Sequence, residues 1–181
     1  MKTATRISIG VFALALGTQT LSAQEHHAHR ADVPKSMRDE HEEIVWGLEN
    51  ALKQPGEVGA RARDLEKVLH PHFVREEQIA LPPLGVLNRL IEIREVEQMQ
   101  HWILPITDSL RAELPGMLAA HKVIAAACAQ LGEAAKAVGN KEVMKLSEEL
   151  LRHARAEEEM YYPMAILVGE IVRGRMQHDK H

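Results

Sequence analysis

The sequence is short of the residues on which disulfide-stabilised and β-sheet proteins depend. Cys128 is the only cysteine in 181 residues, so no disulfide can form within the chain. Because it lies in an alanine-rich run, we expect a small buried core residue rather than a reactive thiol. Aromatic residues make up only 3% and runs of β-branched residues are few, which disfavours strands. With Leu, Ala and Glu abundant, these shortages predict an all-α fold.

The sequence also lacks an excess of positive charge. Its formal net charge is −4, and no segment is dense in Lys and Arg, which argues against a nucleic-acid-binding protein. The length allows one domain with a proper hydrophobic core. No arrangement of Ser, His and Asp or of Cys and His suggests a hydrolase.

The first 23 residues have the pattern of a secretory signal peptide. Two basic residues accompany the apolar run from Ile7 to Leu16, and small residues around Ala23 suit cleavage. We therefore expect an exported protein that starts near Gln24, in the periplasm if the source is Gram-negative. The apolar run is too short to span a bilayer, and we expect no later segment to do so. Stable membrane association after cleavage is therefore not expected.

A polar leader follows the signal peptide, at residues 24–35, and it contains His26, His27 and His29. After cleavage His26 would be the third residue, where an amino terminus, two amide nitrogens and an imidazole can bind Cu(II) or Ni(II) in a square plane. The alternative is a polar leader with no ligand. A copper titration of the mature protein against a His26→Ala variant separates the two.

Apolar residues in the rest of the chain recur at alternating spacings of three and four, as in bundle helices. We expect four long helices that begin after Ser36, at Glu57, after Pro105 and after Asn140. Asn140 should cap the last of them, and the third should kink or restart at Pro115. The apolar face of the last helix should include Met160, Met164 and Leu167.

Two of the three connections are short, which predicts an antiparallel four-helix bundle over residues 36–170. The longer connection, residues 86–104, predicts an extra helix on the outside of the bundle, with His101 at the surface. Residues 171–181 are expected to form a C-terminal tail, and no ligand spacing is visible at its two histidines, His178 and His181.

Two segments carry the same polar pattern: residues 72–82 read HFVREEQIALP, and residues 153–163 read HARAEEEMYYP. In each, a histidine is followed at i+4 by a glutamate, which places both side chains on one helix face. A lone histidine precedes each pair at a similar distance. The resulting set is His41, His72 and Glu76 in the first half and His121, His153 and Glu157 in the second.

All six groups fall on faces that should point into the bundle core. A buried carboxylate without a partner costs several kcal/mol, so something must compensate Glu76 and Glu157. Metal ions do this, and four imidazoles with two carboxylates suit two ions bridged by the glutamates. Nitrogen and oxygen ligands without thiolate favour iron or manganese, and zinc could also bind.

The order of a lone histidine, a His-x-x-x-Glu pair and a later proline, twice over, resembles the hemerythrin-like family, or HHE cation-binding domain. The resemblance covers about residues 36–170 and implies a bundle that holds a non-haem di-iron centre. By position it implies the ligands His41, His72, Glu76, His121, His153 and Glu157, with the two glutamates bridging. Oxygen-carrying hemerythrins have a further histidine where this chain has Ala125, and an aspartate at i+5 in place of Glu157 at i+4. The chain is more similar to members that handle iron or respond to oxygen and nitric oxide.

Three functions follow as hypotheses. The leading one is an exported di-iron protein that binds O2, NO or peroxide, or handles iron, with an unknown redox partner. The second is a redox-silent binder of zinc or another divalent ion. The third is a structural or interaction bundle without metal. Around the site, Glu77 and Glu158 could bond the imidazoles from outside. Tyr161, one turn beyond Glu157, could approach the metals.

Overall fold

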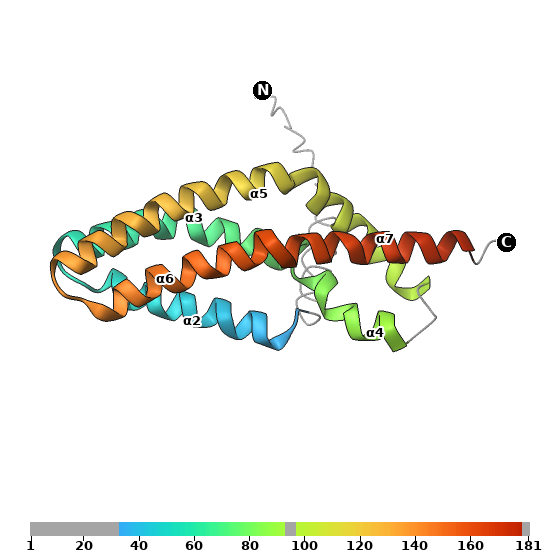
Figure 1. Ribbon diagram of the computed structural model, residues 1–181, viewed down its shortest axis with the longest axis horizontal. Helices are drawn as coiled ribbons and strands as arrows, with labels where there is room; N and C mark the ends of the chain where they lie inside the picture. Colours follow the sequence, from blue (N-terminus) through green and yellow to red (C-terminus); the bar gives the residue numbers. More distant parts are fainter. Residues whose placement is uncertain (1–32, 93–96, 179–181) are drawn as a thin grey trace, which may run out of the picture.

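The computed structural model describes residues 33–92 and 97–178, and within these ranges every regular element is a helix. The expected signal peptide and the leader histidines His26, His27 and His29 lie outside the described residues. Four long helices are α2 (Lys35–Leu52), α3 (Gly56–Ile79), α5 (Glu97–Ala137) and α6 (Lys141–Ala156). Each packs against two others, because α2 contacts α3 and α6, and α5 contacts the same two helices (Figure 1). The predicted all-α four-helix bundle is confirmed.

The two short connections depend on two glycines and on the predicted cap residue Asn140. Gly56 and Gly139 have positive φ angles of 67° and 70°, a conformation that glycine adopts without steric cost. Asn140 caps α6, since its side-chain oxygen accepts a hydrogen bond of 3.2 Å from the Val143 N–H. The hairpins α2–α3 and α5–α6 are therefore closed by local chain chemistry.

The half of the bundle next to these short connections is filled by apolar side chains from all four helices. Its buried residues include Ile44, Leu48, Leu65, Leu69, Ile124, Cys128, Leu131, Leu146 and Leu150. Cys128 is fully buried, as predicted, and burial raises the pKa of its thiol to about 12. A thiol in this state is inert, so Cys128 serves packing.

Helix α5 is longer than the sequence suggested. It begins at Glu97 rather than after Pro105, and it runs without interruption through Pro105 and Pro115. Both prolines remove a backbone donor, but burial of Ile103 and Leu110 in the core holds the helix together across them. Figure 1 shows α5 changing direction within its N-terminal half, as expected for a helix with internal prolines.

The connection between α3 and α5 is not a single helix on the outside of the bundle. It consists of the 3-10 helix η1 (Pro82–Val86), the short helix α4 (Leu87–Glu92) and the first turns of α5. Apolar side chains of this connection form a separate core with the C-terminal helix α7 (Tyr162–His178). The predicted extra helical segment is present, but its expected position on the outside was wrong, because the buried residues Val86, Leu90, Met99 and Ile103 pack against Val168 and Val172. His101 is exposed, as predicted.

Helix α6 continues into α7 through η2 (Glu157–Tyr161), a single π-helical turn. Its extra residue turns the following side chains by about 100° relative to an unbroken α-helix. Met160 and Leu167 are therefore 55% exposed each, although the sequence placed them on the buried face. Tyr162 takes the inward position instead and is fully buried. The helix extends to His178, through most of the expected tail.

A backbone hydrogen bond from residue i+5 to residue i, the kind that forms a π turn, also occurs where the first His-x-x-x-Glu pair ends. The Leu81 N–H donates to the Glu76 carbonyl over 3.0 Å, five residues back. In the second pair, the Tyr162 N–H donates to the Glu157 carbonyl, also five residues back. Each of these bonds lies directly before a proline, Pro82 or Pro163, which has no N–H to continue the α-helical pattern.

Helix α5 is long and apolar enough to cross a membrane by length and composition. The expectation that no segment after the signal peptide has this character was therefore wrong. Core helices of bundles have the same properties, and α5 packs against α3, α6 and α7.

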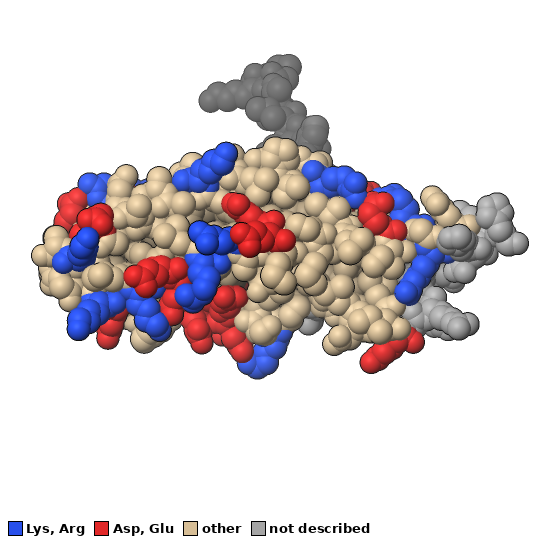
Figure 2. Space-filling view, viewed as in Figure 1, with Lys and Arg blue, Asp and Glu red and all other residues tan. Residues whose placement is uncertain are grey.

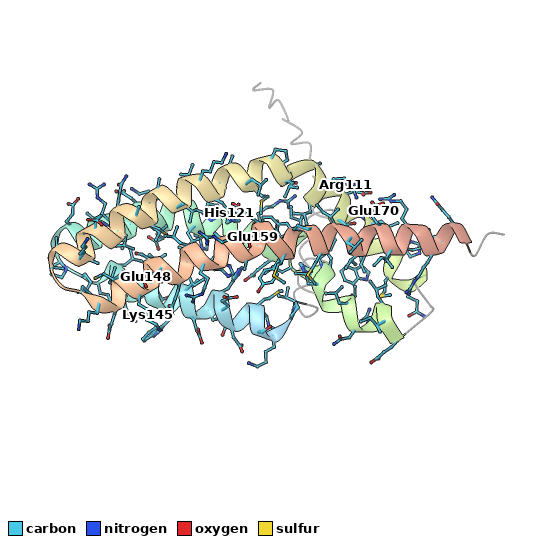
Figure 3. The ribbon with its side chains drawn as sticks, viewed as in Figure 1. Arg111, His121, Lys145, Glu148, Glu159 and Glu170 are labelled. Atoms are coloured by element: carbon cyan, nitrogen blue, oxygen red, sulfur yellow. The ribbon has the colours of Figure 1, made fainter. Side chains whose placement is uncertain are left out.

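Helices α5 and α7 lie side by side and are joined at the surface by ion pairs. Arg111 pairs with Glu170 (Figure 3). Arg173 pairs with Asp108 at 2.6 Å. On the face shown in Figure 2, Lys and Arg lie among Asp and Glu rather than in a region of one sign. Exposed pairs of this kind stabilise a fold by at most about 1 kcal/mol each, so close backbone packing must hold α7 in place.

The close packing of α7 against α5 gives a testable prediction at Gly169. A Cβ at this position would lie 2.2 Å from Oγ1 and 2.8 Å from Cβ of Thr107 on α5. We expect Gly169→Ala to destabilise the fold by about 1–3 kcal/mol, because the two helices must move apart. Gly174→Ala is the matched control, since a Cβ there meets nothing within 4 Å. It should stabilise α7 by about 0.5–1 kcal/mol. Urea unfolding of both variants measures the contrast, and equal effects would contradict it.

Candidate metal centre

The six predicted side chains meet in the middle of the bundle. His41 lies on α2, His72 and Glu76 on α3, His121 on α5, His153 on α6, and Glu157 begins η2. Glu76 and Glu157 are 0% and 1% exposed, and the four histidines are buried as well. Figure 3 shows His121 pointing from α5 into the bundle. Helical spacing explains each intrahelical pair, since His72 and His153 lie one turn before Glu76 and Glu157.

Atoms of these side chains form two overlapping groups. The His41 set consists of His41, Glu76, His153 and Glu157, and the His121 set consists of His72, Glu76, His121 and Glu157. Within each set, one ligand atom from every residue lies within 4.8 Å of the others. Both glutamates belong to both sets. Each set could hold one cation, and the two cations would then share the two carboxylates.

Several site atoms have no hydrogen-bond partner in the described part of the chain. Oε2 of Glu76 is buried, and its ion-pair contact is Nε2 of His41 at 3.7 Å. Oε1 of Glu157 and Nε2 of His72 are buried without a well-aligned hydrogen bond, although they lie 3.1 Å from Nε2 of His153 and 2.9 Å from Oε1 of Glu76. Nε2 of His41 and Nε2 of His153 face each other at 3.1 Å, so one hydrogen must lie between two nitrogens. Buried polar atoms are rarely left unpaired, because each one costs about 1–3 kcal/mol. This donor set therefore fits cations placed among the inward-facing atoms.

The shifted pKa values of the metal-free site show which positive charges a metal cation would replace. Burial alone lowers the pKa of His41, but contacts with Glu157, Glu77 and Glu76 outweigh it and raise the pKa to about 9. His121 behaves in the same way, with its pKa raised to about 10 by Glu157, Glu76 and Glu158. Burial favours the neutral form of Glu157, yet the surrounding imidazoles hold its pKa well below the usual range. Imidazolium protons thus balance the buried carboxylates when no metal is bound.

Three more carboxylates lie on the outer side of the imidazoles. Glu158 accepts a hydrogen bond of 2.9 Å from Nδ1 of His121, which turns Nε2 inward. Glu77 lies 3.8 Å from Nδ1 of His41, and both of these neighbours were suggested by the sequence. Glu40 lies 3.3 Å from Nδ1 of His153 and was missed. Only the packing of α2 against α6 brings it there, so no spacing in the sequence could have indicated it.

The structure places Tyr162, and not Tyr161, at the site. Its hydroxyl donates a hydrogen bond to Oε1 of Glu76 and lies 3.1 Å from Nε2 of His121. Burial and the charges of Glu76 and Glu157 raise the pKa of Tyr162 far above its usual value. Tyr161 is only half-buried. The sequence pointed to Tyr161 because an α-helical turn was assumed where the chain has a π turn.

A groove of ≈ 670 Å³ between α2 and α3 leads to the outer side of the site. His41 and Phe73 form part of its wall, and their rings stack with centroids 4.0 Å apart. Trp46 also lines the groove and is 68% exposed. The groove brings solvent up to the ring of His41, whereas Phe73 covers one face of that ring.

Comparison with known proteins gives one match. The family model of the hemerythrin HHE cation-binding domain matches residues 32–165, a range that includes all six predicted side chains and Tyr162. No curated protein and no solved structure matches the chain. The matched range covers most of the sequence and ends in the first turn of α7. The chain belongs to the hemerythrin HHE cation-binding domain family.

Proposed function

We propose that this chain is a non-haem di-iron protein that binds a small ligand such as O2, NO or peroxide at the bundle-core site. The observation that carries the proposal is the overlap of the two ligand sets through Glu76 and Glu157. A single-ion site would not need two buried carboxylates that each reach both sets of imidazoles. Two ions of double positive charge would balance the carboxylates and engage the inward-facing nitrogens.

The donor set supports iron and an open coordination position. Each set supplies two imidazoles and two shared carboxylates, without thiolate, which suits iron or manganese better than a soft metal. Four protein ligands leave room at each ion for a small molecule. When bound, iron would supply reversible one-electron chemistry and the place where that molecule attaches.

The chain's own residues would orient the ligands and keep water out. Glu158 fixes the ring of His121, and Phe73 packs flat against the ring of His41. Buried apolar side chains close the site from both ends of the bundle, Leu69 and Leu150 on one side and Leu110 and Met117 on the other. A buried site with apolar walls favours a small, weakly polar ligand.

Metal analysis with optical spectroscopy tests the proposal. The purified protein should contain about two irons per chain, and the oxidised form should show ligand-to-metal charge-transfer absorption that changes when O2, NO or peroxide is added. A colourless protein that holds two zinc ions would instead identify a redox-silent metal binder. A protein whose melting temperature is unaffected by any of these metals would identify a bundle without a metal function.

Glu158 allows a graded test of the site. Replacing it with glutamine keeps the shape but removes the charge that holds Nδ1 of His121, so metal affinity should fall by about 10–100-fold. Glu159→Gln is the matched control, because Glu159 is the next residue on η2 and its side chain is exposed. Competition titrations with a coloured chelator measure both variants. Equal affinities would show that Glu158 does not support the site.

We also propose export, on the basis of residues 1–23 alone. Mass spectrometry of the protein expressed with its complete N-terminus should find a mature chain that begins near Gln24. A chain that keeps these residues in the cytoplasm would contradict export and leave the metal site unaffected.

A further inference from the structure

Tyr162 is the one buried hydroxyl among the described residues that touches the metal site. The chain has only two tyrosines, and Tyr162 is 0% exposed. Its hydroxyl contacts Oε1 of Glu76 and Nε2 of His121. His121 belongs to the His121 set alone, and Oε1 of the shared Glu76 faces that set, 2.9 Å from Nε2 of His72 and 3.6 Å from Nε2 of His121. The hydroxyl therefore lies among the donors of one particular cation position and not between the two positions.

The backbone is shaped so that this tyrosine reaches the site. In an unbroken α-helix the residue four positions after Glu157 shares its face, and that residue is Tyr161. The π turn η2 moves the inward position on by one, so Tyr162 points to the site from the first residue of α7. Single π turns are uncommon and are frequent at functional sites, because each gives up regular α-helical bonds.

A cation in the His121 set would change the surroundings of the hydroxyl. Both hydrogen-bond partners of Tyr162, a carboxylate oxygen and an imidazole nitrogen, would turn their lone pairs toward the cation. The Tyr162 hydroxyl, which has no other hydrogen-bond partner among the described residues, would then lie beside the positive charge. A nearby cation favours loss of a proton from a bound oxygen, which reverses the effect of burial. The set also has room, because Ala125 offers no ligand one turn after His121.

We propose that the phenol oxygen of Tyr162 is a fifth protein ligand of the cation in the His121 set, as phenolate bound to Fe(III). This inference depends on the proposed di-iron function. On binding, the O–H bond breaks, the oxygen electron pair forms the bond to Fe(III), and the proton leaves to water. Fe(III) is produced when each Fe(II) gives one electron to an added oxidant such as ferricyanide. The His41 set has no such group, so one ion of the pair would carry a phenolate and the other would not.

The test is the spectrum of the oxidised protein. Metal-free full-length protein is loaded with Fe(II) without oxygen, then oxidised with one equivalent of ferricyanide per iron. Phenolate bound to Fe(III) gives an intense charge-transfer band in the visible range, and resonance Raman excitation in that band enhances phenolate ring vibrations. Because the chain has two tyrosines, such vibrations in the unaltered protein can come only from Tyr161 or Tyr162.

Two variants assign the band. Compared per bound iron, Tyr162→Phe should lose the phenolate vibrations, whereas Tyr161→Phe should keep both its iron content and the vibrations. If Tyr162→Phe does not fold, retention of the vibrations in Tyr161→Phe still assigns them to Tyr162. Loss of the vibrations in Tyr161→Phe, or iron-loaded protein without any phenolate vibrations, overturns the proposal. Failure of the protein to bind iron at all would instead overturn the di-iron function, so the two failures are distinguishable.

Discussion

A Glu157→Gln variant is expected to lose both metal ions, whereas a His41→Ala variant is expected to lose one. Glu157 belongs to both ligand sets, and His41 belongs to one. Removing the shared carboxylate takes a negatively charged ligand from each cation and leaves three imidazoles around a neutral amide. Removing His41 leaves every residue of the His121 set in place.

Metal analysis after dialysis against a weak chelator measures this difference. We expect about two ions per chain in the unaltered protein, about one in His41→Ala and close to none in Glu157→Gln. Two controls are available: Glu159→Gln, two residues along η2 and exposed, and His101→Ala, an exposed histidine on α5. Both should keep the metal content of the unaltered protein. One ion retained in Glu157→Gln would show that the carboxylate is not shared.

Metal removal should lower the melting temperature, and the loss should grow as the pH rises. A ligand that binds only the folded state at 1,000 times its dissociation constant stabilises it by about 4 kcal/mol. For a chain of this size that corresponds to about 10 °C. Without metal, buried carboxylate oxygens lack well-aligned hydrogen bonds, and this cost of burial is why metal removal should reach the stability of the fold.

The pH dependence follows from the raised pKa values of His41 and His121. Their pKa values in the folded metal-free protein are about 9 and about 10, against 6.5 when unperturbed. Their contribution to stability is therefore complete below pH 6.5 and is lost as the pH rises through 9 to 10. In the loaded protein the imidazoles are neutral ligands, and protons no longer supply the compensating charge.

Differential scanning calorimetry of loaded and metal-free protein from pH 6 to pH 10 tests this prediction. At each pH the loaded protein is the control for titration of all other groups. The difference in melting temperature should widen steadily across this range, and each binding event near pH 7 should release protons. A constant difference would show that the buried histidines are neutral in the metal-free state.

The sequence was sufficient for the features that depend on regular helical spacing. The i, i+4 spacing of His72 with Glu76, and of His153 with Glu157, placed both pairs on inward faces because α3 and α6 are regular up to those glutamates. Glycine at each of the two short turns adopts the positive φ angle that closes the hairpin. Buried charge without a partner then indicated that the residues had to meet.

The sequence was insufficient where tertiary packing overrides local preference. Pro105 and Pro115 suggested helix ends, but the packing of α5 on α7 keeps one helix across both. The π turn has no distinctive composition, so the change of inward residue from Tyr161 to Tyr162 could not be foreseen. Glu40 reaches His153 only through contact between two helices that are distant in sequence.

Both His-x-x-x-Glu pairs end in a backbone hydrogen bond that spans five residues, so the backbones of the two halves of the bundle are alike at this point. In the two hairpins, His41 corresponds to His121. Leu81 corresponds to Tyr162, because each donates its backbone N–H to the carbonyl of the glutamate five residues earlier. Leu81 is as buried as Tyr162 but has no oxygen. The two halves thus have similar backbones around an unsymmetrical centre, with the hydrocarbon side chain of Leu81 in one half and the phenol of Tyr162 in the other. The two ligand sets therefore have different surroundings, and the two proposed cations would not be equivalent.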